Sequence, residues 1–231
     1  MNFDAAFEAL DSKVRELLLD SGAGHDYDHT LRVMKNAEML LEEHPGADGT
    51  ILRFAALLHD CARPEEHNSK GQVCHARRGA ELALELMRTL RLPEDFSCAV
   101  AEAIRTHRYR DGILPQSPEG KLLYDADKLD SRGAVGRGRA FLLAGACNAR
   151  VHNTAKEALE GAAYGPEDTA YREFLVKLRH LPDVMLTPAG RRMAKERLGV
   201  MENFFRTLNK EIYGTEEVIS GTEKLEKTPD R

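Results

Sequence analysis

Residues 51–60 read ILRFAALLHD, an apolar run that ends in the doublet His59-Asp60. Leu52, Ala55 and His59 recur at three- and four-residue steps, so in a helix they share one face. The imidazole then points toward the interior at the end of that helix. Because a buried polar ring needs a hydrogen-bond partner or a metal, His59 is the first candidate site residue.

Three other histidines have the same kind of placement outside this run. His29 begins a stripe that continues through Val33 and Ala37, His75 heads the apolar face of residues 74–91, and His107 ends the apolar face of residues 94–107. A single histidine of this kind is usually a satisfied core residue. Four of them, with Asp60 and Asp127 available as carboxylates, favour a shared metal centre.

The ligands on offer are imidazole and carboxylate, with no thiolate. This set suits Mn, Fe, Co, Ni, Zn or Mg, and a site left open to water suits hydrolysis or oxygen chemistry. An alternative is a zincin-type helix, because His25 and His29 have the HxxxH spacing. In that motif a Glu follows the first His, whereas Asp26 stands here and reaches less far.

Helical periodicity runs through the whole chain, and strand-like alternation is almost absent. We therefore expect an all-α, single-domain bundle of short helices. The polar stretch 63–72 is expected to be a loop, and residues 150–166 look irregular, with a helix over part of them as the alternative. The expected helices cover 3–18, from Asp26 or Asp28 to about 44, 49–60, 74–91, 94–107, 119–130, 132–149, 167–180 and 188–213.

Composition narrows the function classes. The 231 residues carry a formal charge of −5, which argues against a general nucleic-acid or anionic-membrane binder. The sequence contains no transmembrane run and no secretory signal. Its four cysteines are scattered and form no CxxC pair, which predicts free thiols and a cytoplasmic location.

Three motifs together resemble the HD-domain metal-dependent phosphohydrolases. They are HDYDHTLRV around His29, AALLHDCAR around His59-Asp60, and LLYDADKLDS around Asp127. The stretch KLRHLPDVMLTPAGRRMAKER is also similar to a subgroup of small bacterial HD hydrolases, some of which cleave nucleoside triphosphates. That subgroup generally lacks a histidine at the position of His75, so the number of metals and the substrate stay open.

The resemblance implies an all-α fold with residues 20–145 as the metal-dependent hydrolase core. An N-terminal helix would occupy 1–19, C-terminal helices packing on the core would occupy 146–213, and a flexible tail would occupy 214–231. The first metal would be held by His29, His59, Asp60 and Asp127. His75 and His107 match positions where some branches of the family hold a second metal or a phosphate.

The expected reaction is cleavage of a phosphate ester or phosphoanhydride, most naturally of a nucleotide, by metal-activated water. Asp60 would bind metal and assist proton removal, and Arg63 and Lys128 would stabilise phosphoryl charge. His25 and Asp26 would orient His29, although Asp26 is equally suited to capping a helix. Further cationic candidates are Arg108, Arg132, Arg137 and Arg139.

Two rival functions are a dinuclear-iron oxygenase of HD type and a nucleotide-binding sensor without turnover. The stripe Ala194, Leu198, Met201, Phe205, Leu208 and Ile212 is expected to be core, with a homodimer seam as its alternative. The expected partner is a small phosphorylated molecule, with no membrane and no stable nucleic-acid binding.

Overall fold

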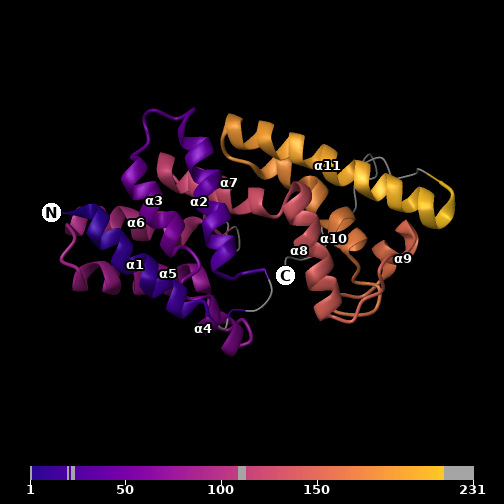
Figure 1. The fold of residues 1–231 in the computed structure, drawn as a ribbon, viewed down its shortest axis with the longest axis horizontal. Helices are drawn as coiled ribbons and strands as arrows, with labels where there is room; N and C mark the ends of the chain where they lie inside the picture. The colour runs from indigo at the N-terminus through magenta and orange to yellow at the C-terminus, as the bar shows by residue number, and fades with distance from the viewer. Residues whose placement is uncertain (1, 20, 22–23, 109–112, 216–231) are drawn as a thin grey trace. The chain divides into compact units, whose positions relative to one another are not determined.

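A computed structural model describes residues 2–19, 21, 24–108 and 113–215 (Figure 1). These residues form helices and no strand, which confirms the all-α prediction. The α-helices are α1 Phe3–Leu17, α2 Tyr27–Leu41, α3 Gly49–Leu58, α4 Arg63–Asn68, α5 His75–Thr89, α6 Glu94–Thr106, α7 Pro118–Asp130, α8 Gly133–Ala146, α9 Ala155–Glu160, α10 Ala170–Val176 and α11 Pro188–Tyr213, with a 3₁₀ helix η1 at Leu178–Val184.

The chain divides into two compact units. The first comprises residues 1–130 and 185–191, and the second comprises residues 131–184 and 192–231. The domain boundaries expected from the sequence stay a prediction. Of the expected tail, all but residues 214 and 215 lies outside the described residues.

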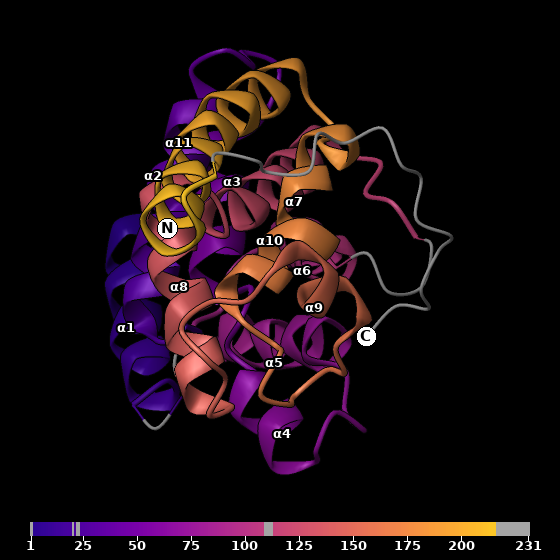
Figure 2. The ribbon, with the colours of Figure 1, turned by 90° about the vertical axis from the view of Figure 1, so that its right-hand side faces the viewer.

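Helix α3 lies at the centre of the first unit. It packs against α1, α2, α6 and α7, while α5 packs against α6 and α4 (Figures 1 and 2). All but the first residues of α3 and Arg53 are buried, as its apolar sequence predicts. Asp48 caps the helix by accepting hydrogen bonds from the amides of Thr50 and Ile51. His59 and Asp60, which directly follow α3, therefore lie in the interior of the unit.

Helix α4 corrects the expectation of a loop over residues 63–72. Pro64 stands in its first turn, where a missing N–H costs nothing, and the Glu66 amide bonds the carbonyl of Ala62. No residue of α4 is buried. A short polar helix has no apolar stripe, which is why periodicity misses it.

The segment 185–191 belongs to the first unit because it is bound to α7. The buried carboxylate of Asp125 accepts hydrogen bonds from the amides of Leu186 and Thr187, both at 2.8 Å, and from the Thr187 hydroxyl at 2.7 Å. At Gly190 an added Cβ would lie 2.2 Å from Asp125 Oδ2. Only glycine permits this approach.

The second unit has its own core. Tyr171, Phe174, Met201 and Phe205 are buried there, and α10 packs against α8, α9 and η1. Ala194, Met201 and Phe205 of the α11 stripe are fully buried, which confirms the core interpretation for them. Ile212, near the end of α11, is 47% exposed, so the core interpretation is wrong for that residue. The short helix α9 lies in the stretch expected to be largely irregular and begins at a capping box of Thr154 and Glu157.

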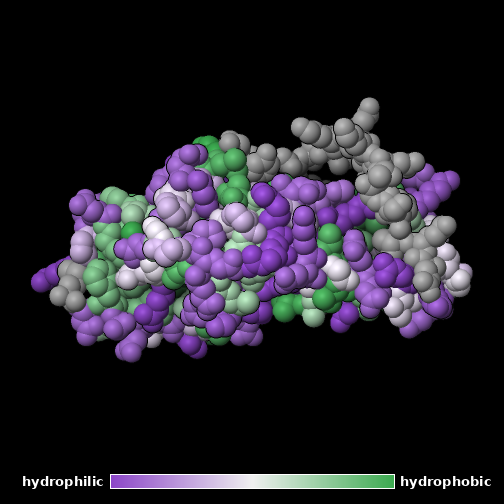
Figure 3. Space-filling view, turned by 90° about the horizontal axis from the view of Figure 1, so that it is seen from above, coloured by the Kyte–Doolittle hydropathy of each residue, from purple (hydrophilic) through white to green (hydrophobic). Residues whose placement is uncertain are grey.

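Within the described residues, no helix is both long enough and apolar enough to cross a bilayer. On the face drawn in Figure 3, hydrophilic side chains dominate and the hydrophobic ones form small patches.

Candidate metal centre

Six side chains of the first unit converge from five helices or their ends. His59 caps the end of α3, with Asp60 following it, and His107 caps the end of α6. His29 lies in the first turn of α2, His75 is the first residue of α5, and Asp127 lies on α7. The side chains of the four histidines and of Asp60 are at most 2% exposed, whereas the side chain of Asp127 is 21% exposed. The group is thus buried on most sides and open at Asp127.

The histidines form two pairs. In the first pair, the Nε2 atoms of His29 and His59 lie 3.2 Å apart. In the second pair, the Nε2 atoms of His75 and His107 also lie 3.2 Å apart. In each pair, the Nε2 atoms of the two rings thus face one another.

Asp60 stands between the two pairs. Its Oδ2 atom lies 3.5 Å from His29 Nε2 and 3.7 Å from His59 Nε2. Its Oδ1 atom lies 3.5 Å from His75 Nε2 and 3.8 Å from His107 Nε2. Asp127 Oδ1 adds a second carboxylate 3.5 Å from His29 Nε2. The Asp60 carboxylate therefore faces both pairs, with Oδ2 toward the first pair and Oδ1 toward the second.

The hydrogen-bond partner of each ring's Nδ1 atom determines whether its Nε2 atom carries a hydrogen or a lone pair. The Nδ1 atoms of His59 and His107 lie 2.8 and 2.6 Å from the carbonyl oxygens of Ala56 and Ile104. A carbonyl only accepts hydrogen bonds, so both Nδ1 atoms carry a hydrogen. Burial lowers the pKa of both rings. Each ring is then neutral, and its Nε2 presents a lone pair.

His29 and His75 are anchored by carboxylates instead. His29 Nδ1 lies 2.7 Å from Asp130 Oδ2, and His75 Nδ1 lies 2.9 Å from Glu66 Oε2. Asp130 in turn accepts from Arg32 Nε at 2.7 Å. Carboxylates behind imidazoles fix ring orientation and tautomer in metal sites.

The first pair already stabilises positive charge. Burial disfavours the charged form of His29, but hydrogen bonds to Asp127, Asp130 and Asp60 outweigh it and raise its pKa to about 10. The pKa of Asp60 is held well below its usual range: burial opposes this, but the charge of Arg63 and the hydrogen bonds from His25 and His29 prevail. His29 and Lys128 do the same for Asp127 against the effect of burial.

These groups fit a divalent cation. Imidazole nitrogens and carboxylate oxygens within 4.8 Å of one another form three overlapping sets, each able to hold an ion: His25, His29 and Asp60; His29, His59 and Asp127; Asp60, His75 and His107. Lone pairs 3.2 Å apart repel one another unless a proton or a cation lies near them. The donor chemistry is that of Mn, Fe, Co, Ni, Zn or Mg sites.

The two residues expected to orient His29 have other hydrogen-bond partners than its ring. Asp26 caps α2 and accepts from the His29 amide at 2.9 Å, so it contacts the backbone of His29 and not its ring. His25 Nδ1 lies 3.1 Å from Asp60 Oδ2. Since α2 begins at Tyr27, His25 precedes the helix, and the zincin-type interpretation is wrong.

The expected cationic residues divide between the units. Arg63 Nε bonds Asp60 Oδ1 at 2.9 Å, and Lys128 Nζ donates to the His107 carbonyl at 3.3 Å. Both therefore lie beside the centre. Arg132, Arg137 and Arg139 belong to the second unit.

Asp130, Arg32 and Glu66 are site residues that the sequence analysis missed. Asp130 follows Asp127 by three residues on one helix, a spacing that places both on one face and was an available signal. Glu66 gave no signal, because α4 carries no periodic pattern.

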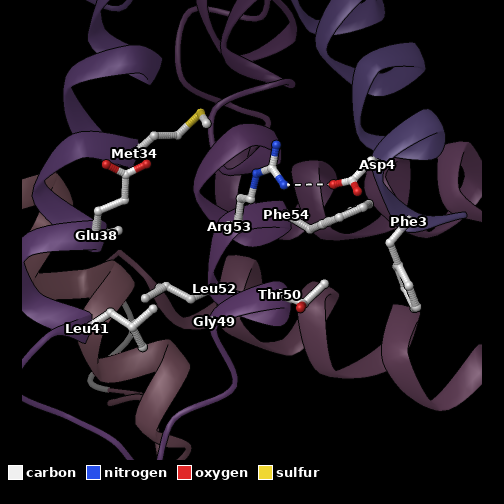
Figure 4. Close-up of a pocket in the computed structure, with 11 residues that line it drawn as sticks. Phe3, Asp4, Met34, Glu38, Leu41, Gly49, Thr50, Leu52, Arg53 and Phe54 are labelled. Atoms are coloured by element: carbon white, nitrogen blue, oxygen red, sulfur yellow. Dashed lines mark hydrogen bonds and ion pairs between the residues drawn. The ribbon is translucent and has the colours of Figure 1, made fainter.

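A separate cavity of about 430 Å³ lies among α1, α2 and α3 (Figure 4). Arg53 Nη1 lies 3.3 Å from Asp4 Oδ1 there. Figure 4 shows this pair, with Met34 and Glu38 on the α2 side. None of the six converging residues lines this cavity.

Comparison with known proteins places the chain in a family. A sequence model of the HD domain matches residues 26–132. The uncharacterized protein YpgQ of Bacillus subtilis strain 168 is 33% identical over 211 residues, which cover 90% of this chain and 94% of YpgQ. The crystal structure of YpgQ in complex with ADP superposes with a TM-score of 0.70 at 28% identity, covering 94% of this chain and 100% of that one.

Two further solved structures are similar over nearly the whole chain. A predicted HD superfamily hydrolase from an uncultured Thermotogales bacterium has a TM-score of 0.63 at 31% identity and covers 88% of this chain and 91% of its own. An HD-superfamily hydrolase from Bacillus thuringiensis has a TM-score of 0.69 at 30% identity, with coverages of 91% and 98%. The chain belongs to the HD-domain superfamily of hydrolases.

Proposed function

We propose that this protein is a metal-dependent phosphohydrolase that cleaves a phosphate ester or phosphoanhydride of a nucleotide. The observation that carries the proposal is the pair of His–His contacts on either side of Asp60. A cation at the first pair would be held by His29, His59, Asp60 and Asp127. A second cation would be held by His75, His107 and the other oxygen of Asp60.

When bound, the metal supplies a Lewis acid that activates water and neutralises phosphoryl charge. Proton removal and further stabilisation of phosphoryl charge depend on side chains of the protein. Asp60 is ionised, and it would hold the metal and assist removal of the proton from the attacking water. Arg63 and Lys128 place positive charge beside the centre, where negative charge develops on the phosphoryl oxygens.

A nucleotide substrate is supported by the family and by YpgQ, whose crystal structure contains ADP. Manganese is the metal we propose to test first. The four cysteines are free, in keeping with the proposed cytoplasmic location.

The deciding experiment incubates metal-stripped protein with Mn²⁺ and a panel of nucleoside mono-, di- and triphosphates, together with cyclic and dinucleoside forms. Pyrophosphate released from a triphosphate identifies a pyrophosphohydrolase, and orthophosphate released from a monophosphate identifies a nucleotidase. Asp60→Ala should lose bound metal and activity together, whereas Asp28→Ala, at an exposed position of α2, should retain both. Full activity with unchanged metal content in Asp60→Ala would refute the proposal.

The same six His and Asp residues also suit a dinuclear-iron oxygenase. An oxygenase takes up iron, absorbs visible light and consumes oxygen, whereas a hydrolase works anaerobically with Mn²⁺ or Mg²⁺. A protein that binds nucleotide tightly, but is silent with every metal under both conditions, would instead be a sensor.

A further inference from the structure

Glu66 occupies a position beside the second histidine pair that no metal-binding role explains. It lies on α4, its side chain is 12% exposed, and three donors converge on its carboxylate. His75 Nδ1 lies 2.9 Å from Oε2, Arg63 Nη1 lies 2.9 Å from the same oxygen, and Arg108 Nη1 bonds Oε1. With these three donors around its carboxylate, Glu66 is an acceptor behind His75.

Arg108 competes with Glu66 for the same ring nitrogen. Its Nη1 atom lies 3.0 Å from His75 Nδ1, close enough for a hydrogen bond. An arginine only donates, so this bond requires a lone pair on Nδ1 and moves the imidazole hydrogen to Nε2. His75 Nε2 would then donate to His107 Nε2, 3.2 Å away. In that tautomer His75 has no lone pair to offer a cation.

We propose that Glu66 is the positioning residue of the second histidine pair. By accepting from His75 Nδ1 and from Arg108 together, it keeps the imidazole hydrogen on Nδ1 and leaves the Nε2 lone pair facing Asp60. The pair then binds a divalent cation and not the oxygen of a phosphate, because a phosphate oxygen needs a donor at Nε2. This inference rests on the proposed function only for the presence of the ion; the choice of tautomer does not depend on it.

The first pair provides a parallel within the same unit. There Asp130 accepts from His29 Nδ1 at 2.7 Å and is held by Arg32 at 2.7 and 3.1 Å. In both pairs, the Nδ1 atom of one ring bonds a carboxylate that also accepts from an arginine. The Nδ1 atom of the other ring bonds a backbone carbonyl. Asp130 comes from α7 and Glu66 from α4, so the two pairs reach the same arrangement with different elements.

The tautomer is measured in metal-free protein by long-range ¹H–¹⁵N correlation of the imidazole rings at pH 8. The His75 signals are identified by their absence in His75→Gln. We expect hydrogen on Nδ1 in the wild type, with the Nε2 atoms of His75 and His107 moving apart from 3.2 Å when no cation lies between them, and hydrogen on Nε2 in Glu66→Ala. Glu65→Ala is the matched control, since Glu65 is the neighbouring residue on α4 and pairs with Arg78 at 2.9 Å. Hydrogen on Nε2 in the wild type, or the same tautomer in Glu66→Ala, would overturn the inference.

The consequence for metal is measured by titrating Mn²⁺ into the same proteins and following the exchange-coupled signal of paired ions by electron paramagnetic resonance. Affinity for the second ion should fall about 10–100-fold in Glu66→Ala, the usual cost of removing a residue that orients a ligand. Glu66→Gln, which keeps an acceptor oxygen, should lose less.

Variants of Arg108 test whether Glu66 positions the His75 ring or only stabilises the fold. Arg108→Ala alone should bind the second ion normally, because Glu66 still accepts from His75. The double variant Glu66→Ala/Arg108→Ala should bind it better than Glu66→Ala, because the competing donor is gone. A double variant no better than Glu66→Ala would overturn the inference. A wild type that binds no Mn²⁺ would instead contradict the proposed function and leave the tautomer measurement to decide the role of Glu66.

Discussion

Histidine is buried in both units of this protein, but in different surroundings. In the first unit His29, His59, His75 and His107 turn their Nε2 atoms toward one carboxylate, and their Nδ1 atoms rest on acceptors. In the described part of the second unit, His152 is the one buried histidine. Its Nε2 donates to Asn209 Oδ1 at 2.7 Å, and its Nδ1 has no partner there.

The difference shows what marks a site. Burial and a perturbed pKa are common to both regions, since burial also lowers the pKa of His152. Among the described residues, only those of the first unit bring several ring nitrogens to one point, with the Nδ1 atom of each ring bonded to an acceptor. Convergence of anchored donors, and not burial, indicates a metal centre.

The largest expected effect is the loss of a converging ring. His59→Ala removes one lone pair from the first pair, and we expect loss of the ion at that pair and a fall in phosphohydrolase activity of at least about 10²-fold. Metal content and initial rates on the best nucleotide check this. His152→Gln, with His67→Ala at an exposed position, should retain both. Equal losses in His59→Ala and His152→Gln would erase the distinction between the two regions.

A smaller effect is expected from the anchor behind the first pair. Asp130→Asn keeps the shape of the side chain but removes the charge that holds His29 Nδ1–H. Metal affinity at the first pair should fall about 10–100-fold, and affinity at the second pair should be unchanged. Calorimetric titration with Mn²⁺ measures both, with Asp28→Asn as the control on α2. An unchanged first affinity would mean that the carboxylate does not orient the ring.

Helix α11 has one glycine in each unit at which the effect of an added Cβ on stability can be compared. In Gly190→Ala the new Cβ would meet Asp125 Oδ2, so we expect the first unit to lose about 1–3 kcal/mol of unfolding free energy. Gly199→Ala in the second unit meets nothing within 4 Å and should be neutral or stabilising by up to about 1 kcal/mol. Urea unfolding measures both. Equal effects would show that Asp125 does not hold residues 185–191 in place.

The smallest effect concerns pH. Because burial lowers the pKa of His152, the folded protein keeps it neutral, whereas the unfolded chain protonates it near pH 6.5. Its contribution therefore favours folding above that pH and is lost as pH falls toward the lower folded pKa, by at most about 1.4 kcal/mol per pH unit. Unfolding free energies at pH 7.5, 6.5 and 5.5 should fall more steeply in the wild type than in His152→Gln. Parallel curves would contradict this account.

Much of the centre could be predicted because its ligands obey local rules. His59, His75 and His107 lie at helix ends on apolar faces, and helical spacing along the chain reveals such positions. The same rule placed α1, α5, α6 and α11 to within a few residues and identified Ala194, Met201 and Phe205 as core. It failed for α4, whose residues are polar and exposed.

What the sequence determined by itself was the all-α fold and the four histidines on apolar helix faces, because both depend on spacings of three and four residues. Asp127 was expected from the resemblance of its motif. The tertiary structure alone decided what stands behind the ligands. Asp130 meets His29 across 101 positions of the chain, and Glu66 reaches His75 only because α4 packs against α5. A ring's tautomer is set by the partner of its outer nitrogen, and that partner comes from the packing of helices, not from spacing within one.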